Sequence, residues 1–317
     1  MELPPLYRRS RLLAAGYSEV ELRRLLRSGE LTPVRRGAYL DQDAPTDAAL
    51  RHAVAAHAAL PQLGDRAVFS HVTAAVLHGL PVWNLPLEHL HATRSRRGVG
   101  RRSRAVLLHS AALDPQEIDT AAGLPVTCLA RTVADLARTA SFEAGVAVAD
   151  AALHGDHDAV PRREPVQPAA LAAALARAAR WPGAPAARRV IAFADGRSDS
   201  VGESRSRVAL HRSRLPAPLL QWEVADGAGR IIGYVDFGWP AQRTVGEFDG
   251  RVKYGRSLSE GRDPGEVVFA EKLREDRLRD QDLAVVRWTW VDLAHFAPVA
   301  ERIRRRLTRS AARRSPS

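Results

Sequence analysis

The order of elements predicted after residue 199 constrains the fold more than any other feature of this sequence. The predicted elements are a helix over 200–213, strands over 218–224, 230–239 and 243–250, a helix over 263–279 and a strand over 284–290. Asp226 and Gly227 form a turn signal between the first two strands. Glu247 and Asp249 alternate along the third strand, so both side chains are expected on one face. This order predicts an α/β core with acids along its strands.

Several segments of this region resemble a known enzyme superfamily. VDFGWP at 235–240, VGEFDGRVKYG at 245–255, and EKLRED with VVRWTW further on, are similar to the PD-(D/E)XK nuclease core, in particular the very-short-patch-repair endonuclease-like domain. The resemblance implies that Asp236 and Glu247 bind Mg²⁺ or Mn²⁺ and that Glu203 is an accessory acid. Magnesium takes one or two carboxylates and completes its shell with water and phosphate oxygens. The metal makes hydroxide accessible near neutral pH and stabilises charge during phosphodiester cleavage.

The sequence departs from this superfamily at one position. The usual Glu-x-Lys ends in lysine, but Asp249 stands there. Lys253 and Lys272 are the two lysines among 47 basic residues, and both flank the acidic segment. Arginine does not replace the compact cation of a lysine, so either residue could serve; otherwise Asp249 is a third ligand or the domain does not cleave. The catalytic candidates are Asp236, Glu247, Asp249, Lys253 and Glu203.

Residues 1–41 are predicted to form a small basic DNA-binding module. Ser18 and Glu21 have the spacing of a capping box, and the helix that they open over 19–28 ends at Gly29. LTPVRRGAYL then predicts a tight hairpin. Residues 1–40 contain eight arginines and four acids, an excess that suits contacts with phosphates. The residues expected to hold DNA are Arg23, Arg24, Arg27, Arg35 and Arg36.

The N-terminal run also resembles a known family. SRLLAAGYSEVELRRLLRSGELTPVRRGAYL is similar to the N-terminal winged helix of the abortive-infection (AbiEi-type) antitoxins of type IV toxin–antitoxin systems. That family uses the winged helix to bind DNA and commonly represses its own operon, so the resemblance implies DNA and a toxin as partners. The family usually has a further helix first, where this chain has only MELPPLYRRS. A winged helix used for protein contacts is the alternative.

The whole chain is expected to be a multidomain α+β or α/β protein. Its predicted segments are a winged helix-turn-helix at 1–41, an antitoxin-like α/β middle domain at 42–155, a helical connector at 156–198 and a nuclease-like domain with a basic tail at 199–317. The alanine-rich connector favours helix over a flexible tether. The basic run from Arg94 to Arg104 is either a phosphate-binding loop or a solvated turn.

Histidines are concentrated in the middle region, at His52, His57, His71, His78, His89, His91 and His109. A zinc cluster needs four ligands brought together, with spacings such as His-x3-His or Cys-x2-Cys on one element. Neither spacing occurs here. We therefore interpret these residues as ordinary packed or surface histidines rather than metal ligands.

Composition narrows the class of partner. A net charge of +11 and a pI near 10.8 favour a polyanion, nucleic acid before a membrane surface. The sequence contains no apolar stretch of roughly 18 residues, and the single Cys128 is typical of a reducing compartment. We expect a cytoplasmic DNA-binding protein with an endonuclease-like domain. The alternative is a non-catalytic repressor or antitoxin, and the two differ in whether the acids support cleavage.

Overall fold

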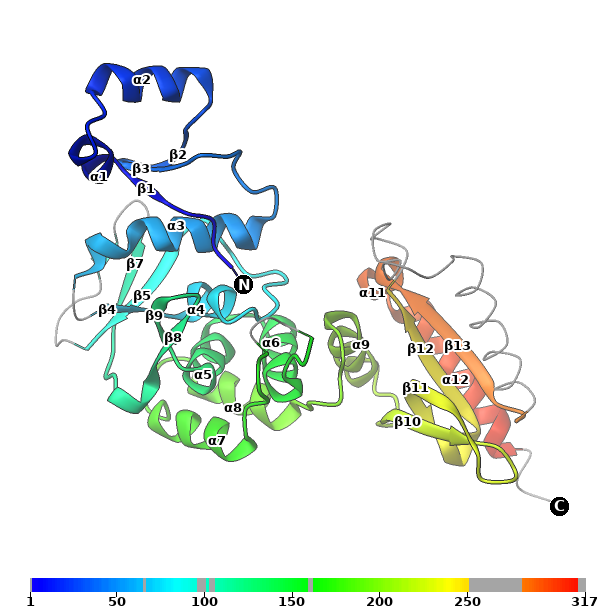
Figure 1. The fold of residues 1–317 in the computed structure, drawn as a ribbon. Helices are drawn as coiled ribbons and strands as arrows, with labels where there is room; N and C mark the ends of the chain where they lie inside the picture. Colours follow the sequence, from blue (N-terminus) through cyan, green and yellow to red (C-terminus); the bar gives the residue numbers. More distant parts are fainter. Residues whose placement is uncertain are drawn as a thin grey trace. The chain divides into compact units, whose positions relative to one another are not determined.

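The computed structural model describes residues 2–64, 67–95, 101–102, 106–158, 162–250 and 281–312. The chain divides into two units, Met1–Gly196 and Arg197–Ser317, each with its own internal packing (Figure 1). The described residues form helices and three β-sheets, so the expected mixed α/β class is confirmed at that level. Helix 263–279, Lys253 and Lys272 lie outside the described residues, as does most of the basic run after Arg94.

A three-stranded sheet begins the first unit. It has the order β1 (Tyr7–Arg8), β3 (Ala38–Leu40) and β2 (Thr32–Arg35), with α1 (Arg9–Ala14) and α2 (Glu19–Ser28) inserted after β1. The predicted capping box is confirmed, because the Ser18 hydroxyl accepts from the Glu21 N–H and the Glu21 carboxylate accepts from the Ser18 N–H. The hairpin is also confirmed: Arg35 pairs with Ala38 across a turn that includes Gly37, whose φ is +77°.

A six-stranded sheet forms the centre of the first unit. Its order is β6 (Arg101–Arg102), β7 (Val106–Ser110), β5 (Leu90–Arg94), β4 (Ala67–Phe69), β9 (Leu124–Thr127) and β8 (Ile118–Ala121). The β5–β7 and β4–β9 pairs are parallel and the others are antiparallel. Helices α3 (Ala48–Leu63) and α4 (His71–Leu77) pack on each other and on β5. The buried Phe69, Ala92 and Val126 join the strands to this helical layer.

Four further helices complete the first unit: α5 (Leu129–Thr139), α6 (Phe142–His154), α7 (Pro168–Arg177) and α8 (Ala184–Phe193). The segment predicted as a connector supplies α7 and α8, which pack on α5 in this unit. Gly183, with φ +83°, lies just before α8. A Cβ there would stand 2.2 Å from the carbonyl oxygen of Arg138, so only glycine allows this approach.

A buried arginine ties α5 to its surroundings. Arg131 is 1% exposed and forms ion pairs with Glu117 of the 3₁₀ turn η1 (Pro115–Glu117), at 2.8 Å, and with Asp135, at 2.9 Å. Its guanidinium carbon lies 4.4 Å from the ring centroid of Trp181. A buried guanidinium requires such compensation, because desolvation of an unpaired charge is costly.

The second unit is built on a four-stranded sheet in the order β10 (Leu219–Ala225), β11 (Ile231–Trp239), β12 (Thr244–Asp249) and β13 (Ala284–Thr289). The first three strands are antiparallel neighbours, and β13 runs parallel to β12. Helix α9 (Val201–Arg212) precedes the sheet, the 3₁₀ turn η2 (Pro240–Gln242) joins β11 to β12, and α11 (Trp290–Ala294) and α12 (Ala297–Ala312) follow it. The four predicted strands and the helix before them are therefore confirmed.

Aromatic packing holds α9 and the sheet of the second unit together. The buried Trp288 stacks on Phe237, with centroids 5.3 Å apart, and donates its indole N–H to the Ser206 hydroxyl of α9 at 2.7 Å. Gly202 opens space for the Phe248 ring, since a Cβ there would lie 1.9 Å from that ring. These contacts fix α9 against β12, the strand that carries two of the predicted acids.

Candidate functional site

Asp236 and Glu247 come from neighbouring strands of the second unit. In the β11–β12 ladder, Phe237 pairs with Gly246. Asp236 directly precedes Phe237 and Glu247 directly follows Gly246, so the two acids occupy the next position along the two strands. Oδ2 of Asp236 accepts a hydrogen bond from the N–H of Phe248 at 2.7 Å. The Asp236 carboxylate therefore lies against the peptide group that directly follows Glu247.

Glu247 is held by an arginine from the next strand. In the parallel ladder it pairs with Arg287 of β13, and Oε2 of Glu247 lies 2.8 Å from Nε of Arg287. The carboxylate is largely buried, at 9% side-chain exposure, whereas Arg287 is 35% exposed. The guanidinium offsets the cost of placing a carboxylate at this depth.

Glu203 is placed differently from the other predicted acids. It is buried in the first turn of α9 and accepts hydrogen bonds from the Asp199 N–H, the Ser200 hydroxyl and the Gln221 amide, at 3.0, 2.7 and 3.0 Å. Burial raises the pKa of Glu203, although these donors act in the opposite direction. The structure thus gives this acid a local role at the start of the helix and connects it to β10 through Gln221.

The acids can be compared with the needs of a divalent ion. Asp236 and Glu247 supply hard oxygen atoms from adjacent strands, and two carboxylates is the number that Mg²⁺ commonly takes from a protein. Asp249 lies two residues after Glu247 and pairs with Thr289 in the ladder. Within the described ranges, these acids do not form a set of three whose oxygens all lie within 4.8 Å of one another. In chemical type, Asp236 and Glu247 therefore match the carboxylate ligands that Mg²⁺ takes, and a divalent ion there would rest on two carboxylates rather than three.

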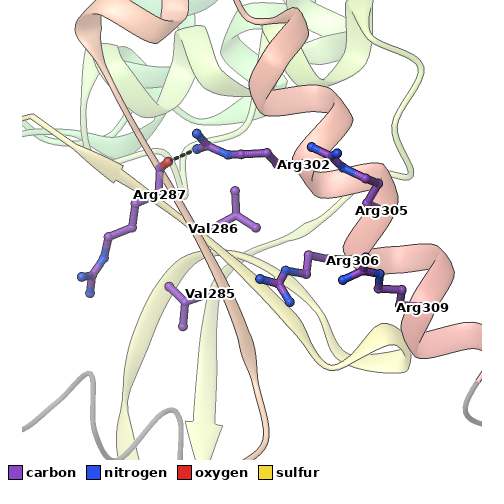
Figure 2. A pocket seen from close by; sticks show the side chains of 7 residues that line it. All are labelled: Val285, Val286, Arg287, Arg302, Arg305, Arg306 and Arg309. Atoms are coloured by element: carbon purple, nitrogen blue, oxygen red, sulfur yellow. Dashed lines mark hydrogen bonds between the residues drawn. The ribbon is translucent and has the colours of Figure 1, made fainter.

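An arginine-rich cavity lies between β13 and α12 of the same unit (Figure 2). Its volume is about 430 Å³, and its lining residues are Val285, Val286, Arg287, Arg302, Arg305, Arg306 and Arg309. Arg302 donates a hydrogen bond to the carbonyl oxygen of Arg287, as Figure 2 shows. The α12 arginines recur at helical spacing on exposed positions. The cavity therefore concentrates positive charge beside β13, the strand whose Arg287 forms the ion pair with Glu247.

The predicted DNA-binding arginines of the first unit fall into two groups. Arg23, Arg24 and Arg27 are exposed on α2, and Arg36 is exposed at the hairpin turn. Arg35 is half-buried and donates a hydrogen bond to the Gln62 side chain of α3 at 2.7 Å. The first group is presented to solvent on one helix and one turn, whereas Arg35 also connects the hairpin to the neighbouring helix.

Sequence spacing missed one cluster of metal-ligating residues. His71, His91 and His109 come together, with one ligand nitrogen from each lying within 4.8 Å of the other two. They belong to three separate elements, α4, β5 and β7. The signal in the sequence is the alternation in HLHAT at 89–93 and RAVLLH at 104–109, which is typical of strands but does not show that the two strands pair.

The chain was compared with known proteins. No protein-family model matches it. Over 253 residues it is 30% identical to two uncharacterized proteins of Mycobacterium tuberculosis, MT2308 of strain CDC 1551 and Rv2248 of strain H37Rv. The match covers 79% of this chain and 81% of each relative. Among the described helices, none combines the length and apolar character needed to cross a bilayer.

Proposed function

This chain belongs to the same family as the uncharacterized mycobacterial protein Rv2248, and we propose that it is a DNA-binding protein that hydrolyses phosphodiester bonds with a divalent metal ion. The observation that carries the proposal is the placement of Asp236 and Glu247 on adjacent strands, with Asp236 hydrogen-bonded beside Glu247. The resemblance of the surrounding segments to the PD-(D/E)XK superfamily supports the same chemistry.

Each acid has a separate task in this proposal. Asp236 and Glu247 hold Mg²⁺ or Mn²⁺, which when bound supplies a Lewis acid and an activated water. Arg287 fixes the position of the Glu247 carboxylate through their 2.8 Å contact. Glu203 is a positioning residue, because its carboxylate is bonded to the start of α9 and to Gln221 of β10.

Positive charge in both units supports DNA as the substrate. The arginines of α12 line a groove beside β13, and those of α2 are exposed. Guanidinium groups hold phosphates in bidentate fashion, and each neutralised phosphate adds to the salt dependence of binding. The second unit therefore combines a phosphate-binding surface and a carboxylate pair on adjoining strands.

A cleavage assay on the full chain tests this proposal. Plasmid DNA is incubated with wild type, Asp236→Ala, Glu247→Ala and the control Glu223→Ala, in Mg²⁺ or Mn²⁺. Glu223 is an exposed acid on β10 that accepts a hydrogen bond from Tyr234. We expect cleavage by wild type and the control, and losses of about 100-fold or more in the other two variants. Wild type that binds DNA without cutting it in either metal would contradict the proposal.

The second candidate function is a non-catalytic repressor or antitoxin of a type IV toxin–antitoxin system. It is favoured by the exposed Arg23, Arg24 and Arg27 on a capped helix followed by a hairpin. Binding to the promoter of the chain's own gene tests it, with the triple alanine variant at these arginines as comparison. A nucleotidyltransferase-like toxin gene beside this gene and salt-dependent promoter binding without cleavage are the results expected for this alternative.

A further inference from the structure

Three histidines converge on the six-stranded sheet of the first unit. His109 of β7 pairs with Thr93 of β5, two residues along from His91. Residues i and i+2 of a strand share a face, and Nε2 of His109 lies 3.0 Å from Nδ1 of His91. His71 follows β4 and stacks on His109 with ring centroids 3.9 Å apart. Two parallel strands and a helix start thus bring the rings together.

His71 is held in a backbone conformation that side chains rarely adopt. Its φ is +52°, in the left-handed region, where a non-glycine residue costs about 1–3 kcal/mol and persists only if its surroundings hold it. Nδ1 of His71 lies 3.0 Å from the Ser70 hydroxyl, which also accepts a hydrogen bond from Thr93 at 2.8 Å. The Ser70 N–H donates to the carbonyl of His91 at 3.0 Å. The surroundings therefore hold the strained residue against β5.

The three rings are suited to bind a cation in their neutral form. Burial lowers the pKa of His71, His91 and His109, that of His91 to about 4. At neutral pH the imidazoles are therefore uncharged, which is the protonation state of a metal-ligating histidine. The ligand nitrogens of all three rings lie within 4.8 Å of one another, and those of His91 and His109 are 3.0 Å apart. A tetrahedral ion with bonds near 2.0 Å holds its ligand atoms roughly 3.3 Å apart, so the stacked rings of His71 and His109 would turn toward a bound ion.

We propose that His71, His91 and His109 form a binding site for a divalent transition metal ion of the zinc type. Imidazole nitrogens select such ions, whereas carboxylates and water select magnesium. Three protein ligands leave a fourth position for water or an exogenous ligand. This inference stands apart from the proposed nuclease site, because it uses different residues, a different unit and a different metal.

Hydroxyl groups orient the proposed ligands. The Ser70 hydroxyl is hydrogen-bonded to Nδ1 of His71, which leaves Nε2 of that ring available for the ion. A ring contact of this kind commonly fixes the tautomer and orientation of a metal-bound histidine. At His91 the hydroxyl contact is to the backbone instead: Thr73 accepts from the backbone N–H of His91 at 2.8 Å and is itself bonded to the His52 ring at 2.8 Å, which fixes β5 at this residue.

Charged residues nearby influence what occupies the fourth position. Arg131 and Arg138 add positive potential at His71, and Asp135 partly balances both through contacts of 2.9 and 3.3 Å. An anion such as hydroxide would be favoured over a neutral ligand next to these guanidiniums.

Calorimetric titration of the full chain tests the site. The untagged protein, stripped with a chelator, is titrated with ZnCl₂, and Co²⁺ substitution reports a tetrahedral site by its visible absorption. We expect one Zn²⁺ per chain in wild type and in the control His89→Ala, which removes a histidine two residues from His91. Affinity should fall about 100-fold or more in His91→Ala and His109→Ala.

Folding of the variants is checked by circular dichroism at the same pH. If His91→Ala or His109→Ala loses its fold, His91→Gln and His109→Gln take its place, and folded variants of this kind should also lose zinc. The proposal is overturned if wild type takes up no stoichiometric zinc, or if folded variants at positions 91 and 109 retain wild-type affinity.

Discussion

The two sheets that carry candidate metal ligands differ in how their sequences place those ligands. In the second unit, Asp236 and Glu247 lie on consecutive antiparallel strands joined by a short turn. In the first unit, His91 and His109 lie on parallel strands, and His71 comes from a third element. Ligands on a hairpin remain close in sequence, whereas ligands on parallel strands meet only through the fold. The comparison therefore separates a proposed site that can be inferred from a sequence motif from a proposed site that depends on strand pairing.

The largest predicted effect is on the free energy of unfolding when an arginine is removed from an ion pair, and we expect it to differ between the two units. Arg131→Ala leaves the buried Glu117 and Asp135 without compensation, so the free energy of unfolding should fall by about 3–5 kcal/mol. Arg287→Ala removes a more exposed partner but leaves the buried Glu247 unpaired, so it should cost less, about 1–3 kcal/mol. Urea unfolding followed by tryptophan fluorescence measures both values. Equal losses of stability in the two variants would show that burial does not determine how much each ion pair contributes.

Reciprocal loss of function tests whether the two proposed metal sites are independent. We expect His91→Ala to lose zinc by about 100-fold while magnesium-dependent cleavage stays near that of wild type. Glu247→Ala should retain zinc and lose cleavage by a similar factor. Zinc titration and plasmid cleavage on the same preparations measure both effects. Loss of both activities in either variant would contradict two independent sites.

Glycine packing tests how the second unit positions its acids. Gly202→Ala places a methyl group against the Phe248 ring of β12 and should cost about 1–3 kcal/mol by overpacking. Gly227→Ala is the matched control, because a Cβ there meets no atom within 4 Å, and its effect should stay below about 0.5 kcal/mol. The free energy of unfolding of each variant provides the measurement. A neutral Gly202→Ala would mean that α9 does not fix β12.

Acid should destabilise the zinc-free first unit through its histidines. Burial lowers the pKa of folded His91 to about 4 from 6.5, so the unfolded chain binds more protons between these values. Stability is therefore fully present above pH 6.5 and falls as pH decreases toward 4, by about 1–2 kcal/mol for this partly exposed ring. Urea unfolding at several pH values measures the loss, which should be smaller in His91→Ala. An unchanged pH profile in that variant would contradict this origin.

Local patterns predicted much of the backbone. The Ser18–Glu21 capping box and the alternation around Glu247 depend on neighbouring residues, and both led to the correct elements. The start of α5 carries no such pattern, because its cap residue is Cys128, whose side chain forms no capping hydrogen bond. The basic C-terminal run begins within α12, which extends to Ala312.

Contacts between segments that are distant in the sequence could not be predicted from sequence patterns. The contact of Arg35 with Gln62 depends on how the hairpin meets α3. One of the three hydrogen bonds to Glu203 comes from Gln221, 18 residues away on β10. The histidine cluster requires the pairing of β5 with β7, which no spacing rule encodes. Tertiary pairing therefore decided which polar residues meet, while local chemistry decided where each element begins.

Gly183 has a consequence for the buried charge of the first unit. Its hydrogen atom occupies space that leaves no room for a methyl group above the Arg138 carbonyl. Trp181, two residues earlier, covers the guanidiniums of Arg131 and Arg138 at 4.4 and 5.0 Å. A larger residue at position 183 would clash with the Arg138 backbone, so we expect it to displace the segment that carries Trp181. A single missing side chain thus allows one indole to lie over two arginines.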